Sequence, residues 1–364
     1  MLDAEAALAR ASGRAGVIPA ADAEAIAAAC RPERFDVHAL GTAAAAGGNP
    51  EIPLDAALRG AVGRAAAESV HRGATSQDIL DTAAALVARR ALRPLTDDAA
   101  AAADACAALA AEHVDTVMIG RTLLQQARPT TLGLEVACWM TAIDEALARV
   151  RAEDELLPAQ LGGPVGTRAA FGERGAEVAA DFARELGLRD PVGPWHTDRV
   201  AFAALAGTLA LLAGTLGKIG RDVTLLAQDE VGEAHERAVP GDAGRGGSSS
   251  MPHKRNPIAA VATVACAQRV PGLVATLYAA MVQEHERAAG AWHAEWETWS
   301  DLLRVAGASA AWGRDMLERL EPDPRRMAAN LASASESAAS VGEAAALVRR
   351  ALAAHDERAT KGAT

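Results

Sequence analysis

The sequence predicts an all-α protein, with a central bundle of long helices and small helical domains before and after it. Apolar residues make up 50% of the 364 residues, whereas aromatic residues make up only 3%. Alanine and leucine carry most of this apolar content, and both favour helices, while β-branched and aromatic residues favour strands. Two further observations agree: long stretches have helical periodicity, and polar, glycine-rich breaks separate them.

The clearest periodicity lies at residues 195–239, where the absence of proline leaves room for a helix of up to about 45 residues, ~65 Å long. Apolar residues there follow a 4-3 spacing, at Leu205, Leu209, Leu212, Leu216, Ile219, Val223 and Leu226. Residues 200–217 carry no charge and reach the lower limit for a membrane span. The seam continues past Lys218, Arg221 and Asp222, so it predicts a bundle helix and no membrane partner.

Three domains follow from where such stretches begin and end. Residues 1–78 hold short helical stretches broken by glycine and proline, and form the predicted N-terminal domain. Residues 79–320 form the predicted bundle, with further long runs at about 79–118, 132–157 and 258–320. The EPDP string that begins at Glu321 marks the start of a short C-terminal helical domain, residues 321–364. No extended strand pattern is evident.

Charge and cysteine content argue against several kinds of partner and site. The net charge of −11 disfavours nucleic acid or an anionic membrane as the main partner. The cysteines lie far apart and form no CxxC pair, which predicts reduced thiols rather than disulfides or a zinc site: Cys30, Cys106, Cys138 and Cys266. The first residues, MLDAEAALARA, contain acids and no apolar core of a signal peptide, so a cytoplasmic protein is expected.

The most specific string in the chain is GSSSMPHKRNP, residues 247–257. An exposed linker with a basic patch would be the simplest interpretation of its glycine, serine and Lys254–Arg255 content. The whole string, however, resembles the signature GSSxMPxKxNP of the fumarase/aspartase superfamily at every fixed position. This resemblance implies a homotetramer built on long helices, with active sites assembled from several subunits.

In that superfamily the signature loop closes over the substrate, and its first serine transfers a proton at a carbon next to a carboxylate. That position is Ser248 here, and the resemblance assigns it a catalytic role together with Lys254, while Ser249 and Asn256 bind the substrate. Because serine is a poor base in water, its alkoxide needs backbone N–H groups and nearby cations to hold its charge. Loop closure would remove water and strengthen those interactions.

A second string, HRGATSQD at residues 71–78, resembles the superfamily segment HxGATSxD. The resemblance assigns a catalytic role to His71 and substrate contacts to Thr75 and Ser76. The break before a long helix also offers backbone N–H groups to a carboxylate. Asp78 has a simpler alternative role as a cap of this helix, and His71 taken alone would be an ordinary polar surface residue.

The third string, GRTLLQQARPTTLG at residues 120–133, resembles the motif GRTHxQxAxPTTxG. Arg121, Thr122 and Gln125 are retained and are expected to bind a substrate carboxylate. Leu123 departs from the motif, because the fumarate- and adenylosuccinate-forming enzymes have a histidine there. Expulsion of an amine or hydroxide needs a proton from a general acid, whereas a carboxylate, with an ordinary pKa of about 4, leaves unaided. Leu123 therefore favours addition or expulsion of a stable anion.

Such a reaction is lactone formation by bacterial 3-carboxy-cis,cis-muconate cycloisomerases, in which one substrate carboxylate adds across a conjugated double bond. The chain resembles this branch over nearly its whole length, which implies a small polycarboxylate substrate, no cofactor and no metal. Further matches are GNP at 48–50 with Ile52-Pro53, QLGGPVG at 160–166, PWHT at 194–197 and QEHERAAGAWHAEW at 283–296. The last string adds His285 and Arg287 as expected substrate ligands. Core packing is the alternative role of Trp195, Trp292 and Trp296, and a structural role that of His285.

Other functions are compatible with parts of the sequence. A lyase that releases another stable anion, such as nitrite from nitrosuccinate, agrees with Leu123, whereas an adenylosuccinate lyase does not. A catalytically inactive structural relative is disfavoured by the intact Ser248, Lys254 and Asn256. A metal enzyme is disfavoured because no set of His, Asp or Glu has ligand spacing such as HExxH. Relative to the family, the first and third domains are expected to be shortened.

Overall fold

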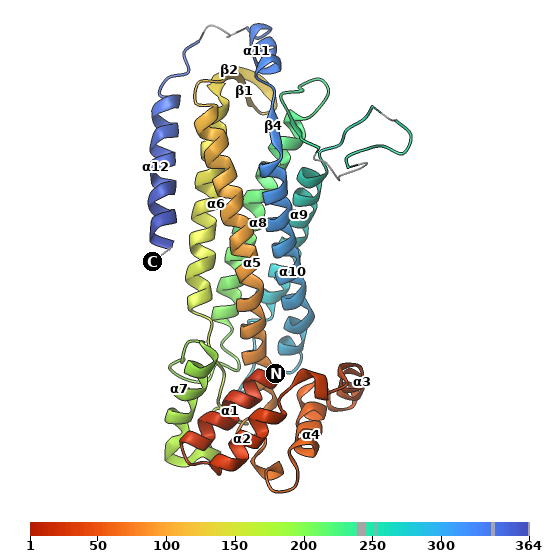
Figure 1. Cartoon of the computed structure of the whole chain (residues 1–364), viewed down its shortest axis with the longest axis vertical. Helices are drawn as coiled ribbons and strands as arrows, with labels where there is room; N and C mark the ends of the chain where they lie inside the picture. The colour runs from red at the N-terminus through yellow and green to blue at the C-terminus, as the bar shows by residue number, and fades with distance from the viewer. Residues whose placement is uncertain (239–244, 252, 336–338, 363–364) are drawn as a thin grey trace. The chain divides into compact units, whose positions relative to one another are not determined.

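The computed structural model of the chain describes residues 1–238, 245–251, 253–335 and 339–362 (Figure 1). Most of these residues are helical, which confirms the predicted all-α class. The α-helices are α1 Leu2–Arg14, α2 Ala20–Ala29, α3 Val37–Gly47, α4 Glu51–Val62, α5 Ser76–Glu112, α6 Leu132–Glu155, α7 Gly175–Leu186, α8 Val200–Leu226, α9 Ile258–Ala279, α10 Ala291–Glu318, α11 Pro324–Ala332 and α12 Ala344–Gly362. Short 3-10 helices span Pro32–Arg34, Ala67–Ser69 and Ala169–Arg174.

The chain forms two compact units, each built from segments that are separate in sequence. Unit 1 contains Met1–Arg90, Glu153–Leu205 and Thr276–Trp299, and unit 2 contains Ala91–Ala152, Ala206–Ala275 and Ser300–Thr364. Helices α5, α6, α8, α9 and α10 contribute residues to both units. The three domain ranges expected from the sequence are a different division of the chain and stay a prediction.

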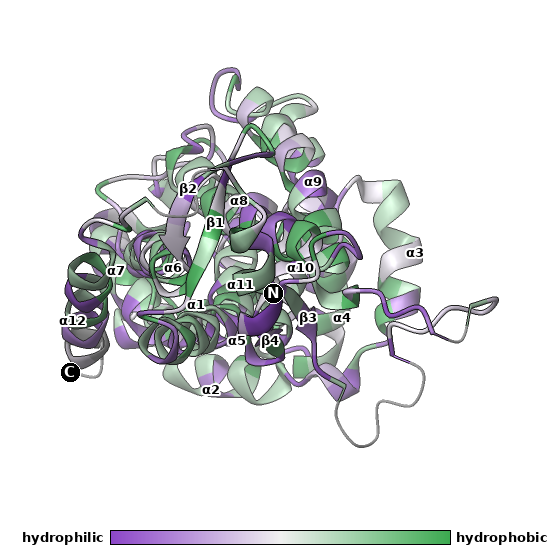
Figure 2. Ribbon diagram, turned by 90° about the horizontal axis from the view of Figure 1, so that it is seen from above, coloured by the Kyte–Doolittle hydropathy of each residue, from purple (hydrophilic) through white to green (hydrophobic). Residues whose placement is uncertain are grey.

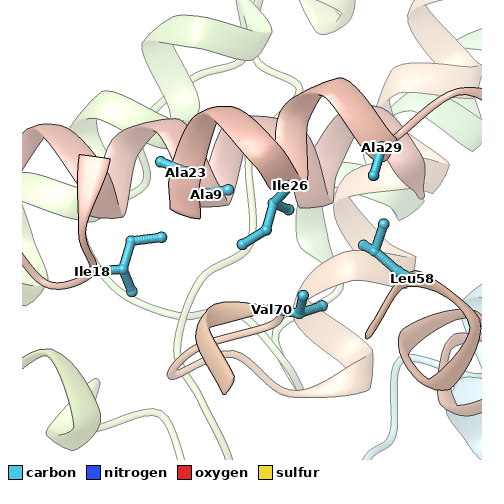
Figure 3. Close-up of a cluster of buried hydrophobic side chains, with 7 residues drawn as sticks. All are labelled: Ala9, Ile18, Ala23, Ile26, Ala29, Leu58 and Val70. Carbon is cyan, nitrogen blue, oxygen red and sulfur yellow. The ribbon is translucent and has the colours of Figure 1, made fainter. Parts of the chain in front are cut away.

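Unit 1 has an apolar core beneath its N-terminal helices. Side chains from α1, α2, α4 and the segment after α4 meet there, as Figure 3 shows: Ala9, Ile18, Ala23, Ile26, Ala29, Leu58 and Val70. Ile26 and Leu58 are fully buried, and burial of such a side chain stabilises the fold by roughly 1.5–3 kcal/mol. Val70 is 1% exposed and immediately precedes His71, so this core fixes the start of the 71–78 string.

Helix α8 contains the predicted 4-3 seam, and all seven seam residues from Leu205 to Leu226 are buried. The helix has 27 residues, fewer than the proline-free stretch allowed. Both α8 and α9 are long and apolar enough to cross a membrane by length and composition, and 50% and 28% of their most apolar windows are buried. Because the seam packs inside the chain, α8 is a core helix of a soluble protein. Figure 2 shows apolar and polar residues mixed along most helices, as amphipathic packing requires.

Helix α5 is the longest element, with 37 residues, and it continues through Pro94. A proline inside a helix removes one backbone hydrogen bond. Leu92 and Leu95 beside it are each 1% exposed, so packing of this turn against the core offsets that loss. The stretch that was expected to be helical at about 79–118 is therefore helical as far as Glu112.

Two short strand pairs were not foreseen from the sequence. Strands β1 Val117–Thr122 and β2 Gln125–Thr131 form an antiparallel hairpin. Its turn residues, Leu123 and Leu124, have φ angles of 50° and 63°, as a two-residue type I′ turn requires. Such turns usually contain Asn-Gly, so a Leu-Leu turn gave no sequence signal. The second pair joins β3 Ala234–Glu236 to β4 Leu320–Pro322.

The EPDP string lies between α10 and the C-terminal helices. The Asp323 carboxylate accepts hydrogen bonds from the backbone N–H groups of Arg325 and Arg326, at 3.0 and 2.9 Å. This is an N-cap, and Pro324 occupies the first helical position, where its missing N–H costs nothing. The boundary therefore has a local cause in the sequence.

Candidate active site

The 71–78 string is held in unit 1 by the carboxylate of Asp78, which is fully buried. This carboxylate accepts hydrogen bonds from the backbone N–H groups of Thr75 (3.0 Å), Gly162 (2.9 Å) and Gly163 (2.8 Å), and lies 2.7 Å from Nε2 of His196. The Thr75 bond caps α5, as one interpretation of the sequence expected. The other contacts bring the QLGGPVG and PWHT strings to the same carboxylate.

The glycines of these strings permit a close approach of backbone to backbone. Gly163 has a φ of +72°, and a Cβ built there would lie 2.9 Å from the carbonyl oxygen of Gly73. A Cβ on Gly73 would in turn lie 2.6 Å from the ring of Phe171. A larger residue at either position would push the two strings apart and displace the donors of Asp78.

A second buried network joins the 71–78 string to the 283–296 string. Arg199, 3% exposed, pairs with Asp81 (2.8 Å) and with Glu295 (2.5 Å). Burial by itself would lower the pKa of Arg199, but the charges of Asp81 and Glu295 outweigh it and raise the pKa. Gln77 donates to Asp81 (3.1 Å) and accepts from Nε of Arg287 (3.2 Å). Arg287, an expected substrate ligand, is thereby tied to Gln77, the residue that follows Ser76 in the chain.

Two tryptophans of the matched strings, Trp195 and Trp292, are buried, in agreement with the core-packing interpretation. Trp292 is 3% exposed and donates from Nε1 to Asp81 (3.0 Å). Trp195 is 6% exposed and donates to the carbonyl oxygen of Ala159 (2.8 Å). His285 is exposed, and its backbone has a φ of 51°, in the left-handed region. Its carbonyl oxygen accepts a hydrogen bond from Oγ1 of Thr197 (3.0 Å). Its side chain is therefore available to a ligand.

His71 lies beside two carboxylates from other helices of unit 1. Its Nδ1 is 2.6 Å from Oε1 of Glu5 and 3.4 Å from Oε1 of Glu51. Burial by itself would lower the pKa of His71, but the hydrogen bond and charge of Glu5 and the charge of Glu51 raise it to about 9. Oγ of Ser76 donates to Oε2 of Glu51 (3.2 Å), so two expected site residues contact one carboxylate.

In unit 2, the oxygen of Ser248 lies where backbone donors surround it. Its Oγ accepts from the N–H groups of Ser250 (3.3 Å) and Met251 (3.2 Å). Two such donors lower the energy of a negative charge on that oxygen. Ser249 and Lys254 are exposed and leave the same segment open to a ligand. Pro252 of the signature string lies outside the described residues.

The ends of this segment are fixed. Asn256 closes it, because its N–H and its Nδ2 both donate to the carbonyl oxygen of Gly246, at 2.7 and 2.9 Å. Arg245 pairs with Asp315. Glu236 accepts from the first N–H groups of α9, those of Ala259 (3.1 Å) and Ala260 (2.8 Å). Ser248 lies on the segment between these contacts of Arg245 and Asn256.

The β1–β2 hairpin carries the third matched string, also in unit 2. Both terminal nitrogens of Arg121 lie 2.8 Å from the buried carboxylate of Glu233. The role of Arg121 as a substrate ligand stays a prediction, since its guanidinium already has an internal carboxylate partner. Thr122 and Gln125 are exposed on the strands, and Leu123 at the tip is 96% exposed.

A pocket of about 980 Å³ lies beside the hairpin in unit 2. Arg121, Thr122, Lys218 and Arg221 line it, together with Glu135. Burial raises the pKa of Glu135 to about 7, and the charge of Asp222 adds to this effect. The pocket therefore combines cations with an acid that exchanges a proton near neutral pH.

The expected site residues thus fall into two groups. His71, Thr75, Ser76, His285 and Arg287 belong to unit 1. The hairpin and signature-loop residues belong to unit 2: Arg121, Thr122, Gln125, Ser248, Ser249, Lys254 and Asn256. Both groups contain polar and cationic side chains of the kinds that bind carboxylates.

Comparison with known proteins decides the family. Residues 1–272 match a family described as lyase. The chain belongs to this lyase family. It is 50% identical over 335 residues to a 3-carboxy-cis,cis-muconate cycloisomerase of Pseudomonas aeruginosa, covering 91% of this chain and 72% of that protein. It is also 45% identical over 342 residues to a nitrosuccinate lyase of Streptomyces davaonensis, covering 91% and 72%.

Solved structures agree with the family. The fold matches the 3-carboxy-cis,cis-muconate lactonizing enzyme of Pseudomonas putida with a TM-score of 0.89 and 36% identity, over 99% of this chain and 94% of that one. A fumarate lyase from Mesorhizobium matches with a TM-score of 0.82 and 32% identity, over 98% and 83%. The protein is therefore an enzyme of the fumarase/aspartase superfamily, as the signature string predicted.

Several residues that shape this lyase site were missed from the sequence. Glu5 sits in the N-terminal string MLDAEAALARA, and Glu51 sits between the matched GNP and Ile52-Pro53. His196 and Glu233 were likewise not assigned. Among the described residues, five non-glycine residues have positive φ, and His71, Leu123 and His285 are three of them. Backbone strain of this kind concentrates at functional sites, so it marks the matched strings independently of their sequence.

Proposed function

We propose that this enzyme is a 3-carboxy-cis,cis-muconate cycloisomerase that forms 4-carboxymuconolactone. In this reaction one substrate carboxylate attacks a carbon of the conjugated diene and closes a lactone. The displaced electron pair moves to the carbon next to another carboxylate, and a proton is delivered there. The proposal is supported by relatives of that name at 46–50% identity and by Leu123, since no leaving group needs a proton.

The geometry of Ser248 is the observation that carries the proton-transfer step. Its O–H gives the proton to carbon, and the resulting alkoxide accepts the N–H groups of Ser250 and Met251. Lys254 and Asn256 hold the carboxylate that shares the charge of the carbanion. Ser249 completes the contacts of this loop, and solvent returns the proton to Ser248 after product leaves.

The remaining expected ligands bind the other carboxylates of the substrate. These are Thr75, Ser76, His285 and Arg287 of unit 1, and Arg121, Thr122 and Gln125 of the unit 2 hairpin. The reaction needs no cofactor and no metal, and we assign the enzyme to the cytoplasm. A homotetramer is supported by exposed apolar residues in unit 2, such as Leu211 at 52% and Val261 at 49%. The α8 seam is not part of this argument, because the chain buries all seven of its residues.

The test is direct. Purified enzyme is mixed with 3-carboxy-cis,cis-muconate after exhaustive chelation, and diene ultraviolet absorbance is followed. We expect the absorbance to fall as lactone forms, with no ammonia or nitrite released. An unchanged absorbance would contradict the proposal, and sedimentation of a monodisperse active monomer would contradict the tetramer.

A nitrosuccinate lyase is the second candidate, and the 45% identity to the Streptomyces enzyme favours it. Nitrite is a stable anion, so its departure needs no acid at Leu123 either. Colorimetric detection of nitrite from nitrosuccinate separates the two. Nitrite release without lactone formation from the triacid would replace the first candidate by the second.

A further inference from the structure

The His71 side chain has its two ring nitrogens in different surroundings. Nδ1 lies 2.6 Å from Glu5 and 3.4 Å from Glu51. Ionised carboxylate oxygens only accept hydrogen bonds, so Nδ1 must carry a proton. Within the described residues Nε2 has no hydrogen-bond partner, and the side chain is 13% exposed. The ring is thus anchored on one side and open on the other.

The two carboxylates are removed from water. Glu5 is 1% exposed and Glu51 is 2% exposed, and Oε2 of Glu5 and Oε1 of Glu51 are buried without a hydrogen-bond partner. Buried carboxylates need a compensating charge or a proton. A neutral imidazole would supply neither, whereas an imidazolium supplies one positive charge to the pair.

The surrounding fold holds these three residues in place. Glu5 lies on α1 one turn before Ala9, and Glu51 begins α4 two turns before Leu58. Ala9, Leu58 and Val70, which precedes His71, belong to the apolar core drawn in Figure 3. The carboxylate–imidazole geometry is therefore fixed by packing on both helices.

We propose that Glu5 and Glu51 are positioning residues that hold His71 as an imidazolium, so that its Nε2–H is a fixed hydrogen-bond donor to a carboxylate of the substrate. The identity of that substrate rests on the proposed function. The protonation state of His71 does not depend on it. An imidazolium has no lone pair and cannot act as a base. We therefore assign His71 to binding that carboxylate, and the proposed function assigns the proton delivered to carbon to Ser248.

Other charged groups near the ring agree with this assignment. Asp55 of α4 adds a third negative charge that favours the imidazolium, and Arg59 partly offsets it through an ion pair with Asp55 (2.8 Å). Burial raises the pKa of Glu51 to about 7, so Glu51 takes up a proton near neutrality. With Glu51 protonated, Glu5 and His71 form a neutral ion pair.

Glu5, Glu51 and His71 are also residue types that bind metal ions, and their ligand atoms lie within 4.8 Å of one another. Two ligands at about 2.1 Å from one metal ion would be roughly 3.0–3.4 Å apart. The 2.6 Å between Nδ1 and Glu5 is shorter than that and matches a charge-assisted hydrogen bond. The geometry therefore favours a proton between these groups.

The experiment follows the ring nitrogens of His71 in the whole enzyme without substrate. Long-range proton–nitrogen spectra are recorded across pH, and His71→Gln identifies the signal among nine histidines. We expect wild-type His71 to titrate near pH 9, and Glu5→Gln to shift the titration down toward the ordinary 6.5. Glu5→Asp, which keeps the charge, should restore part of the shift. Asp3→Asn on the same helix is the matched control and should change nothing, because Asp3 pairs only with exposed Arg90.

Kinetics supply the second readout. Glu5→Gln should raise KM about tenfold at pH 8 with a smaller change in kcat, because a binding charge is lost while Ser248 is intact. A wild-type His71 that titrates at 6.5 or below would overturn the inference, as would one bound zinc per chain that abolishes the titration. If the triacid is not turned over while the titration near pH 9 is found, the proposed substrate fails and the assignment of His71 is supported.

Discussion

The two groups of site residues are held in opposite ways. In unit 1, Asp78 and Asp81 are buried carboxylates with several donors each, and Arg199 joins two segments through a buried ion pair. In unit 2, Ser248 lies on a segment that Asn256 closes on Gly246, and most of its described residues are exposed. Dense buried networks fix ligands but cannot move, whereas a segment anchored at its ends can close over a substrate. The enzyme therefore combines a rigid binding surface with an adaptable catalytic segment.

The largest expected effect tests the catalytic segment. Ser248→Ala should reduce kcat by several orders of magnitude, because the proposed proton-transfer residue is lost. Thermal stability should stay within about 0.5 kcal/mol, since a partly exposed loop hydroxyl packs little. Ser250→Ala is the control: it keeps the N–H that faces Ser248 and should retain activity. A tenth of the wild-type rate in Ser248→Ala would assign the step to another residue.

The rigid surface should respond in the opposite way. Arg199→Met leaves Asp81 and Glu295 buried without their cation, which should lower the free energy of unfolding by about 3–5 kcal/mol. Activity should fall with it, because Gln77 and Arg287 lose their support. Arg304→Met removes an exposed pair with Asp301 and should cost at most about 0.5 kcal/mol in urea titration. Equal losses of unfolding free energy in Arg199→Met and Arg304→Met would contradict the rigid role given to the buried network of unit 1.

The pH dependence of stability sharpens the same contrast. The pKa of Glu51 rises from 4.5 to about 7, and that of His71 rises from 6.5 to about 9. The folded state then holds more protons than the unfolded state, so stability falls as pH rises through each window. We expect these groups to make the melting temperature decline from pH 4.5 to pH 9. In Glu51→Gln the decline between pH 4.5 and about 7 should be shallower. A melting temperature that rises over this range in wild type and is unaltered by Glu51→Gln would exclude the assignment.

The smallest expected effect concerns the hairpin tip. Leu123→His restores the histidine of the amine- and hydroxide-eliminating relatives on a side chain that is 96% exposed. Lactone formation should change less than about twofold, because no leaving group needs a proton. A tenfold gain with the triacid would show that an acid at this position limits the reaction.

The sequence by itself determined the helical class, the α8 seam and the family. These are local properties: apolar spacing fixes which face of a helix is buried, and the signature string is contiguous. The Asp323 cap is local in the same sense, because its partners lie within three residues, although the cap was not predicted from the sequence. The hairpin was missed because its turn contains two leucines instead of glycine or asparagine.

Only the tertiary structure decided which charges meet. Glu5 and His71 are 66 residues apart, and Arg121 and Glu233 are 112 residues apart. Neither pair has a sequence spacing that predicts contact, because the fold topology, and not the local chain, brings them together. The tertiary structure placed His71 beside the carboxylates of Glu5 and Glu51 and gave Arg121 an internal partner in Glu233. A side chain's charge state depends on what surrounds it after folding, and that is why the strings identified the residues but not their roles.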